Sequence, residues 1–99
     1  RLHSAGTTVM LTRIPVTIDV GTIRRELDRL GFRGRYNACH LPMRTSKKGS
    51  MGYVFVNFVT PQDAAECIRE CSGRPFGRVD ATKICIATYS RTQAVAYTR

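Results

Sequence analysis

The octet MGYVFVNF, residues 51–58, constrains the fold more than any other part of this 99-residue chain. Its valines and aromatic residues are typical of a β-strand, in which successive side chains point to opposite faces. One predicted face carries Val54, Val56 and Phe58, and the other carries Tyr53, Phe55 and Asn57. Both faces hold large apolar groups. One face can line a core, so the other must meet a second protein layer or a ligand that binds flat aromatic rings.

Length and charge narrow the class of protein. Ninety-nine residues are enough for one domain with a modest core that needs neither disulfides nor a structural metal. We expect no membrane segment, because no apolar run approaches about 18 residues, and the initial Arg1 without a signal-peptide pattern suggests a piece of a longer protein. Sixteen Lys and Arg against seven Asp and Glu give a net charge of +9. This excess predicts an anionic partner.

Cysteine and histidine usage argues against a metal site and against catalysis. The four cysteines form no C-x-x-C pair, so we interpret them as reduced core residues of an intracellular protein, nuclear or cytoplasmic, with no metal and no cofactor. The chain has two histidines, and no nucleophile–base arrangement is evident around them. The sequence therefore predicts a binding domain and not an enzyme.

Capping and breaking residues divide the chain into elements. A strand over residues 8–14 is closed by proline, and the next helix begins at the capping residue Asp19 and ends at Gly31. The second strand, residues 36–43, contains Pro42 and should therefore lie at a sheet edge. After the octet, Thr60 and a proline begin a second helix that ends before Gly73. A fourth strand is expected over residues 83–90.

The resulting order, β-α-β-β-α-β, predicts an α+β ferredoxin-like fold. In this arrangement a four-stranded antiparallel sheet carries two helices on one face. The other face stays open, and Tyr53 and Phe55 should lie on it. We assign residues 1–6 to a leader, 7–91 to the domain and 92–99 to a C-terminal tail, and we expect a monomeric domain of a larger protein.

The same segments resemble the RNA recognition motif (RRM) over nearly the whole chain. The longer RRM signature is basic-Gly-aromatic-small-aromatic-Val-x-aromatic, and residues 51–58 match six of its eight places, departing at Met51 and Val54. The shorter signature is similar to residues 9–14, with Met10 where an aromatic residue is usual. The chain is similar in particular to the carboxy-terminal RRM of the Mei-two-like meiosis RNA-binding proteins. The segments that carry this similarity are TTVMLTRIP, GFRGRY, LPM, GYVFVNF and KICIATYSRTQ. The resemblance implies binding of single-stranded RNA across the open sheet.

Physical chemistry favours the same ligand. Single-stranded RNA exposes base faces and phosphates together, so its binders combine aromatic platforms with cations. Tyr53 and Phe55 are the predicted platforms, unless a terminal extension or partner domain covers them. On the same face we expect Asn57 of the octet and, on neighbouring strands, Met10, Thr12, Ala38, His40, Ile86 and Thr88. The facing of the fourth strand stays open, because Ile84 and Ile86 are as apolar as the side chains between them.

Charge placement adds candidate phosphate contacts. Six of the seven acidic residues belong to the predicted helices or their caps, and Asp80 is the other one. The basic candidates beside the sheet are Arg13, Arg44, Lys47, Lys48 and Arg91. The loop cations could equally be an ordinary solvated loop. The arginines on or after the first helix (24, 25, 29, 33 and 35) either keep the protein soluble or form a second basic patch.

An alternative function comes from the segment Arg74-Pro75-Phe76. It resembles the Arg-x-Phe element of the UHM proteins, RRM relatives that bind a tryptophan-containing peptide through that loop and the helical face. UHM domains combine the element with an acidic first helix and degraded sheet signatures. Here the first helix is rich in arginine and the sheet aromatics are present. RNA binding is therefore the favoured prediction, and a peptide partner at Phe76 is the alternative.

Overall fold

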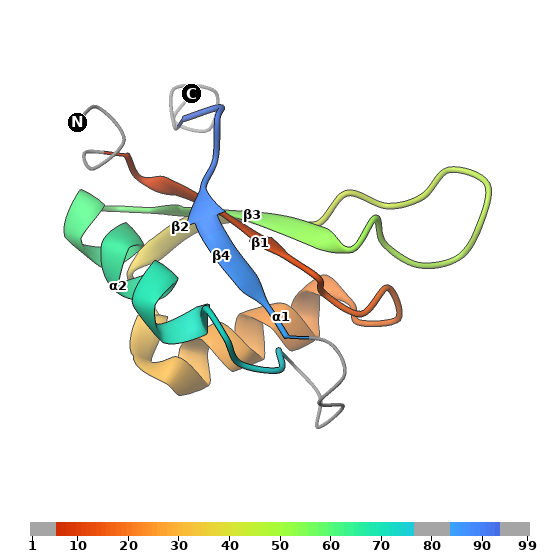
Figure 1. The fold of residues 1–99 in the computed structure, drawn as a ribbon, viewed down its shortest axis with the longest axis horizontal. Coiled ribbons are helices and arrows are strands. Elements are labelled where there is room, and N and C mark those ends of the chain that lie inside the picture. The colour runs from red at the N-terminus through yellow and green to blue at the C-terminus, as the bar shows by residue number, and fades with distance from the viewer. Residues whose placement is uncertain (1–5, 77–83, 94–99) are drawn as a thin grey trace.

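The computed structural model describes residues 6–76 and 84–93. The elements follow the predicted order: β1 (Thr8–Thr12), α1 (Val20–Leu27), the π-helical turn η2 (Asp28–Phe32), β2 (Tyr36–His40), β3 (Tyr53–Phe58), α2 (Pro61–Cys71) and β4 (Ile86–Tyr89). Neighbouring strands pair antiparallel in the order β2-β3-β1-β4. Both helices lie on one side of this sheet (Figure 1). The predicted ferredoxin-like fold is confirmed, and β2 lies at an edge as Pro42 indicated.

The helices begin and end where their capping residues predict. The Asp19 carboxylate accepts a hydrogen bond from the Thr22 N–H at 2.8 Å, and the Thr60 hydroxyl accepts one from Asp63 at 3.1 Å. Gly31, with φ of 101°, and Gly73, with φ of 84°, follow in the left-handed region. The first helix differs from expectation in its last turn, η2, where the chain is kinked because Gly31 has non-helical backbone angles.

All four strands are shorter than predicted. β3 begins at Tyr53, two residues into the octet, because Gly52 takes a left-handed φ of 90°. β1 ends at Thr12, two residues early, because Arg13 takes a left-handed φ of 64° that breaks the strand. β2 ends at His40, since Pro42 cannot donate to the ladder, and Met43 forms only an isolated bridge with Ser50. β4 is shorter than expected and covers Ile86–Tyr89; residue 83 of the predicted strand lies outside the described residues.

The core lies between the helices and one face of the sheet. Val54, Val56 and Phe58 of β3 are 0–1 % exposed, and the Phe58 ring meets the Phe32 ring edge-on at 5.6 Å. The four cysteines are free, and three of them are buried. Burial raises the pKa of Cys85 to about 12 and that of Cys39 to about 11, so these two thiols stay protonated at neutral pH. No helix in the described residues is long and apolar enough to cross a membrane.

Candidate nucleic-acid interface

Tyr53 and Phe55 lie side by side on the face of the sheet that the helices leave open. Their ring centroids are 5.6 Å apart with an interplanar angle of 80°, and both side chains are partly exposed. Val54 and Val56, which alternate with them, are fully buried. The two-faced octet predicted from the sequence is therefore confirmed, and its second face carries an exposed aromatic pair.

The sheet register aligns further candidates into two rows. In the first row, Phe55 lies between His40 on β2 and Met10 on β1, and Met10 lies opposite Thr88 on β4. In the second row, Tyr53 lies opposite Thr12, which in turn lies opposite Ile86. The structure thus brings together six predicted site residues: Met10, Thr12, His40, Tyr53, Phe55 and Thr88.

β4 contributes two residues that were expected on the open face, Ile86 and Thr88. Cys85 and Ala87 are buried, whereas Ile86 is 45 % exposed and Thr88 is also exposed. This alternation settles which side of β4 belongs to the open face. Ile86 is therefore an apolar neighbour of Thr12 and Tyr53 on that face. The sequence analysis expected Ile86 on this face but left the facing open, because apolar residues occupy both sides of the strand.

Asn57, another predicted site residue, is used inside the protein. It is 3 % exposed, and its Oδ1 accepts hydrogen bonds from the hydroxyls of Thr7 at 2.9 Å and Thr8 at 2.7 Å. Its Nδ2 donates to Asn37 Oδ1 at 2.7 Å. These partners come from β1 and β2, far away in the sequence. In this arrangement Asn57 ties three strands together at the end of the open face.

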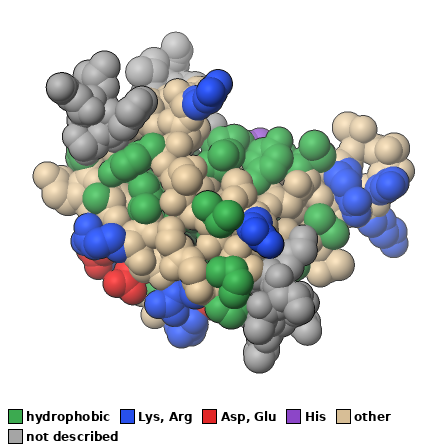
Figure 2. All heavy atoms as spheres, in the orientation of Figure 1, with side chains coloured by type: hydrophobic (Ala, Val, Ile, Leu, Met, Phe, Trp, Pro, Cys, Tyr) green, Lys and Arg blue, Asp and Glu red, His purple; other side chains and the backbone are tan. Residues whose placement is uncertain are grey.

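The basic loop between β2 and β3 projects beyond the sheet (Figure 1). Arg44 N–H donates to the Gly49 carbonyl at 3.0 Å, and the Arg44 guanidinium donates to the Lys48 carbonyl, so the loop is closed at its base. Lys47 and Lys48 are exposed. Figure 2 shows Lys and Arg side chains gathered over this projection. The loop therefore presents ammonium groups beside the strand that carries Tyr53 and Phe55.

A glycine fixes how that loop meets the body of the domain. Gly49 has φ of 100°, and a Cβ there would lie 2.7 Å from the Val16 carbonyl oxygen. The next residue, Ser50, donates its N–H to the same carbonyl at 3.0 Å and is buried. A side chain at position 49 would push the loop away from the turn that follows β1.

Two further cations, Arg13 and Arg91, occupy opposite ends of the sheet. Arg13 directly follows β1 at Thr12, whereas Arg91 follows Ser90, whose N–H donates to the Thr8 carbonyl at the other end of β1. Both arginines are exposed. The structure therefore does not bring them together, and a ligand contacting both would have to span the length of the strands.

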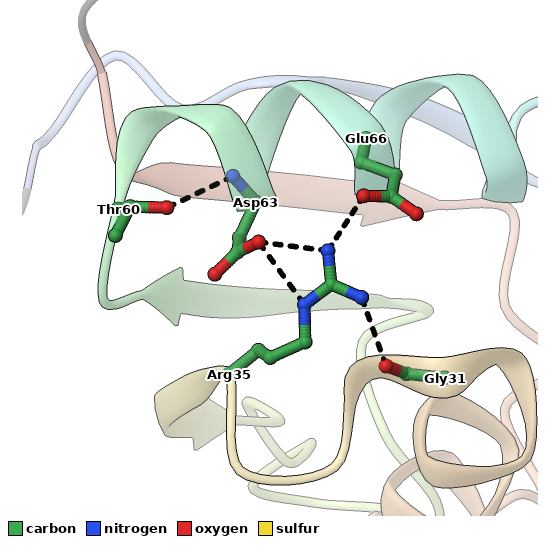
Figure 3. A network of polar contacts seen from close by, with 5 residues as sticks. All are labelled: Gly31, Arg35, Thr60, Asp63 and Glu66. Atoms are coloured by element: carbon green, nitrogen blue, oxygen red, sulfur yellow. Dashed lines mark hydrogen bonds and ion pairs between the residues drawn. The ribbon is translucent and has the colours of Figure 1, made fainter.

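Arginines on the helical side have acidic partners. Arg35 contacts Asp63 at 2.7 Å and Glu66 at 2.5 Å, and it also donates to the Gly31 carbonyl at 3.0 Å (Figure 3). The bond from Arg35 lowers the pKa of Asp63. Arg29 forms a second ion pair, with Glu26. Part of the first-helix arginine group is therefore neutralised locally, unlike Lys47 and Lys48.

The segment behind the peptide-binding alternative does not present its aromatic ring at the surface. Phe76 is 1 % exposed and belongs to the hydrophobic core. Arg74 Nε donates to the Glu70 carbonyl at 2.6 Å, and its guanidinium lies 3.6 Å from the Glu70 carboxylate. Both side chains thus fasten the segment after α2 to the domain.

Gln93 is a structural residue that sequence analysis missed. Its Oε1 accepts from the N–H groups of Thr7 at 2.8 Å and Thr8 at 2.9 Å, and its Nε2 donates to the Ser90 and Thr8 carbonyls. A Cβ on Gly6 would lie 2.7 Å from Gln93 Oε1. One amide side chain in the predicted tail therefore hydrogen-bonds the backbone at the start of β1.

Residues 6–76 and 84–93 contain no group of three His, Cys, Asp or Glu that could hold a metal ion. What these residues do assemble is an exposed aromatic pair on an open sheet with cations at its edges. Residues 6–98 match the family RNA recognition motif 2. The chain belongs to this family. Membership points to a binding domain and not to an enzyme.

Relatives of this RRM include plant MEI2-like proteins. It is 26 % identical over 91 residues to MEI2-like 3 of Oryza sativa subsp. japonica, covering 92 % of this chain and 9 % of the relative. It is 25 % identical over 87 residues to MEI2-like 1 of Arabidopsis thaliana, covering 88 % of this chain and 9 % of that protein. The resemblance to Mei-two-like RRMs is confirmed, and the chain spans about a tenth of these relatives' length.

Solved RRM structures share the fold. The second RRM of the yeast poly(U)-binding protein Pub1 aligns with a TM-score of 0.70 at 18 % identity, covering 89 % of this chain and 98 % of that one. The RNA15 RRM with bound RNA (GU) aligns with a TM-score of 0.67 at 20 % identity, covering 90 % of this chain and 87 % of the other. These likenesses support the ferredoxin-like architecture.

Proposed function

We propose that this RRM binds single-stranded RNA across its open sheet face. The observation that carries the proposal is the partly exposed pair Tyr53 and Phe55, placed next to each other in the middle of the sheet on β3. Stacking of a base on an aromatic side chain contributes about 1–3 kcal/mol and tolerates any base. Two adjacent rings can therefore bind two nucleotides whatever their identity.

The surroundings of the rings suit RNA. Met10 and Ile86 extend the apolar surface, while Thr12, Thr88 and His40 add hydrogen-bonding groups for base edges. Lys47 and Lys48 stand at one side for phosphates, with Arg13 at one end of the strands and Arg91 at the other. The solved neighbours described as an RRM with bound RNA and as a poly(U)-binding protein support the same ligand class.

We also propose that the domain is a monomeric unit of a larger RNA-binding protein that acts in the nucleus or cytoplasm. The length of its MEI2-like relatives, about ten times that of this chain, supports the larger protein. A tryptophan-containing peptide is the competing ligand, and the burial of Phe76 argues against it.

The test is an NMR titration with short RNA oligomers of mixed sequence. We expect shifts at Tyr53, Phe55 and Met10. A matched pair of variants separates stacking from mere apolar contact: Phe55→Leu keeps an apolar side chain but removes the ring, whereas Phe55→Tyr keeps the ring. Affinity should fall about tenfold in the leucine variant and hold in the tyrosine variant. Shifts around Phe76 with a tryptophan peptide, and none on the sheet with RNA, would reverse the assignment.

A further inference from the structure

Two adjoining pockets lie beyond the free edge of β2, outside the face just described. The first, of about 360 Å³, is lined by Asp19, Val20, Cys39, His40, Leu41 and Met43. The second, of about 340 Å³, shares Asp19 and Met43 and is bounded on its far side by Arg44, Lys48 and Gly49. Together they form a hollow between the start of α1 and the base of the basic loop.

The first pocket is continuous with the candidate RNA surface. His40 lines it and also lies directly opposite Phe55 in the sheet register. An RNA strand that stacks on Phe55 and crosses the β2 edge at His40 therefore passes into the pocket. Its walls are mainly apolar, and Met43, which lies between the two pockets, is 56 % exposed. Such a surface suits a flat base.

The second pocket has the charge that a phosphate needs. Arg44 and Lys48 both line it. The Arg44 guanidinium reaches the Lys48 carbonyl, yet its Nε–H is buried without a hydrogen-bond partner among the described residues. A phosphate in the pocket would therefore lie beside the Arg44 guanidinium and the Lys48 ammonium group.

Asp19 borders both pockets and supplies the only negative charge among the residues that line them. Its Oδ1 accepts from the Thr22 N–H at 2.8 Å, and this bond lowers the pKa of Asp19, so the carboxylate is ionised at neutral pH. A carboxylate accepts hydrogen bonds from amino groups on base edges, as Asp and Glu do from cytosine N4. Uracil has no amino group and can offer a carboxylate only its ring N3–H. A carboxylate at the rim is therefore placed to distinguish bases that carry an amino group from uracil.

We propose that the pocket beside His40 takes the base of the nucleotide next to the stretch bound on the sheet, with its phosphate in the pocket beside Arg44, and that Asp19 favours bases bearing an amino group. This inference rests on the proposed RNA function. It extends the binding path past the stacking rings, around the β2 edge, to residues that are not part of either sheet signature.

Methionine methyl NMR tests this path with probes the protein already contains. Met10 lies on the sheet, Met43 in the pocket and Met51 on the same hairpin as Met43 but lining neither pocket. With 13C-methyl methionine, a dinucleotide should shift Met10 alone. The RNA is then lengthened one nucleotide at a time at its 5′ or its 3′ end. Lengthening at only one of the two ends should shift the methyl signal of Met43. Shifts of Met10 without any of Met43 at every length would overturn the pocket and leave the sheet site standing.

Measurements of RNA affinity test the pocket in a second way. The nucleotide that reaches the pocket should raise affinity about tenfold. Met43→Ala should remove most of that gain without changing affinity for the dinucleotide, and Met51→Ala, which truncates the same exposed side-chain type outside the pockets, should leave the gain intact. Equal weakening in both alanine variants would overturn the assignment.

Base choice tests Asp19 separately. Oligomers that differ only at the added nucleotide should bind about tenfold more tightly with A, C or G than with U. Asp19→Asn retains a side-chain oxygen for the helix cap and removes the charge, so the protein should stay folded while the preference weakens. Equal affinities for the four bases in the unaltered protein would overturn the role of Asp19. Failure of the sheet site would look different: Met10 would not move with any RNA.

Discussion

The two faces of β3 carry the same kinds of side chain and have different fates. Val54, Val56 and Phe58 are buried under the helices, and the Phe58 ring packs against the Phe32 ring. Tyr53 and Phe55 stay partly exposed although their rings are as apolar. On one face the chain supplies its own covering layer. On the other the described residues supply none, so apolar surface of the same kind stabilises the fold on one side and can bind a ligand on the other.

Charge follows the same division. On the covered side, Arg35 and Arg29 contact acidic residues of the helices and their turn. On the open side, Lys47 and Lys48 project from a loop that contains no acidic residue. Cations that the protein pairs itself contribute to the fold, whereas exposed cations beside stacking rings attract phosphates. Each of the following substitutions tests one side of this comparison against the other.

The largest effect is expected from Phe58→Ala. The ring is 1 % exposed and contacts Phe32 and Tyr36, so its removal leaves a cavity and should lower the free energy of unfolding by about 3–5 kcal/mol. Urea unfolding followed by circular dichroism measures it. If the free energy of unfolding fell by less than about 1 kcal/mol, the surrounding core side chains would have to fill the space that the ring leaves.

Phe55→Ala, three residues earlier on the same strand, should have the opposite profile. Its ring contacts Tyr53 and faces away from the helices, so the domain should stay folded with a near-normal urea midpoint. RNA affinity should fall by about 1–3 kcal/mol, measured by fluorescence anisotropy with a labelled oligomer. Early unfolding combined with unchanged affinity would show that the two faces have been assigned the wrong way round.

Much of this division could be predicted from local sequence. Alternation in residues 51–58 predicts the two faces. Asp19 and Thr60 predict where the helices begin, because each caps an N–H three residues later. Gly31 predicts where the first helix ends, because its own backbone takes a left-handed φ. These signals need no knowledge of the tertiary structure.

Long-range contacts could not be predicted in the same way. Asn57 belongs by alternation to the same face as Tyr53 and Phe55, yet it is buried because the hydroxyls of Thr7 and Thr8, about fifty positions away, converge on it. Gln93 lies 85 positions from Thr8, and nothing in a polar tail marks one amide as a partner for β1. The pockets beside β2 likewise arise only when α1, the β2 edge and the loop base come together.

The double variant Lys47→Ala, Lys48→Ala tests the exposed cations. Removing one cation that binds a phosphate of single-stranded RNA should flatten the dependence of log affinity on log salt by about 0.7, so the slope should change by roughly one unit or more. Unrelated oligomers should weaken by similar factors, measured at three salt concentrations. The control, Arg24→Ala with Arg33→Ala, removes two charges from the covered side and should leave the slope unchanged. A flattened slope in this control would reveal a second basic patch there.

Arg35→Gln tests the paired cations and should have the smallest effect. Arg35 hydrogen-bonds Asp63 and lowers its folded-state pKa below the usual value of 3.8. A carboxyl whose pKa is lowered by folding stabilises the protein above its unfolded-state pKa, and that stabilisation is lost as pH falls through the folded-state value. Without Arg35 the folded-state and unfolded-state pKa values of Asp63 lie closer together. The drop in urea midpoint between about pH 7 and about pH 3 should therefore be smaller in Arg35→Gln than in the unaltered protein. Arg33→Gln, an exposed neighbour, should keep the full drop, and neither variant should change RNA affinity at neutral pH. An RNA defect in Arg35→Gln with an unaltered pH profile would place this arginine in the binding site instead.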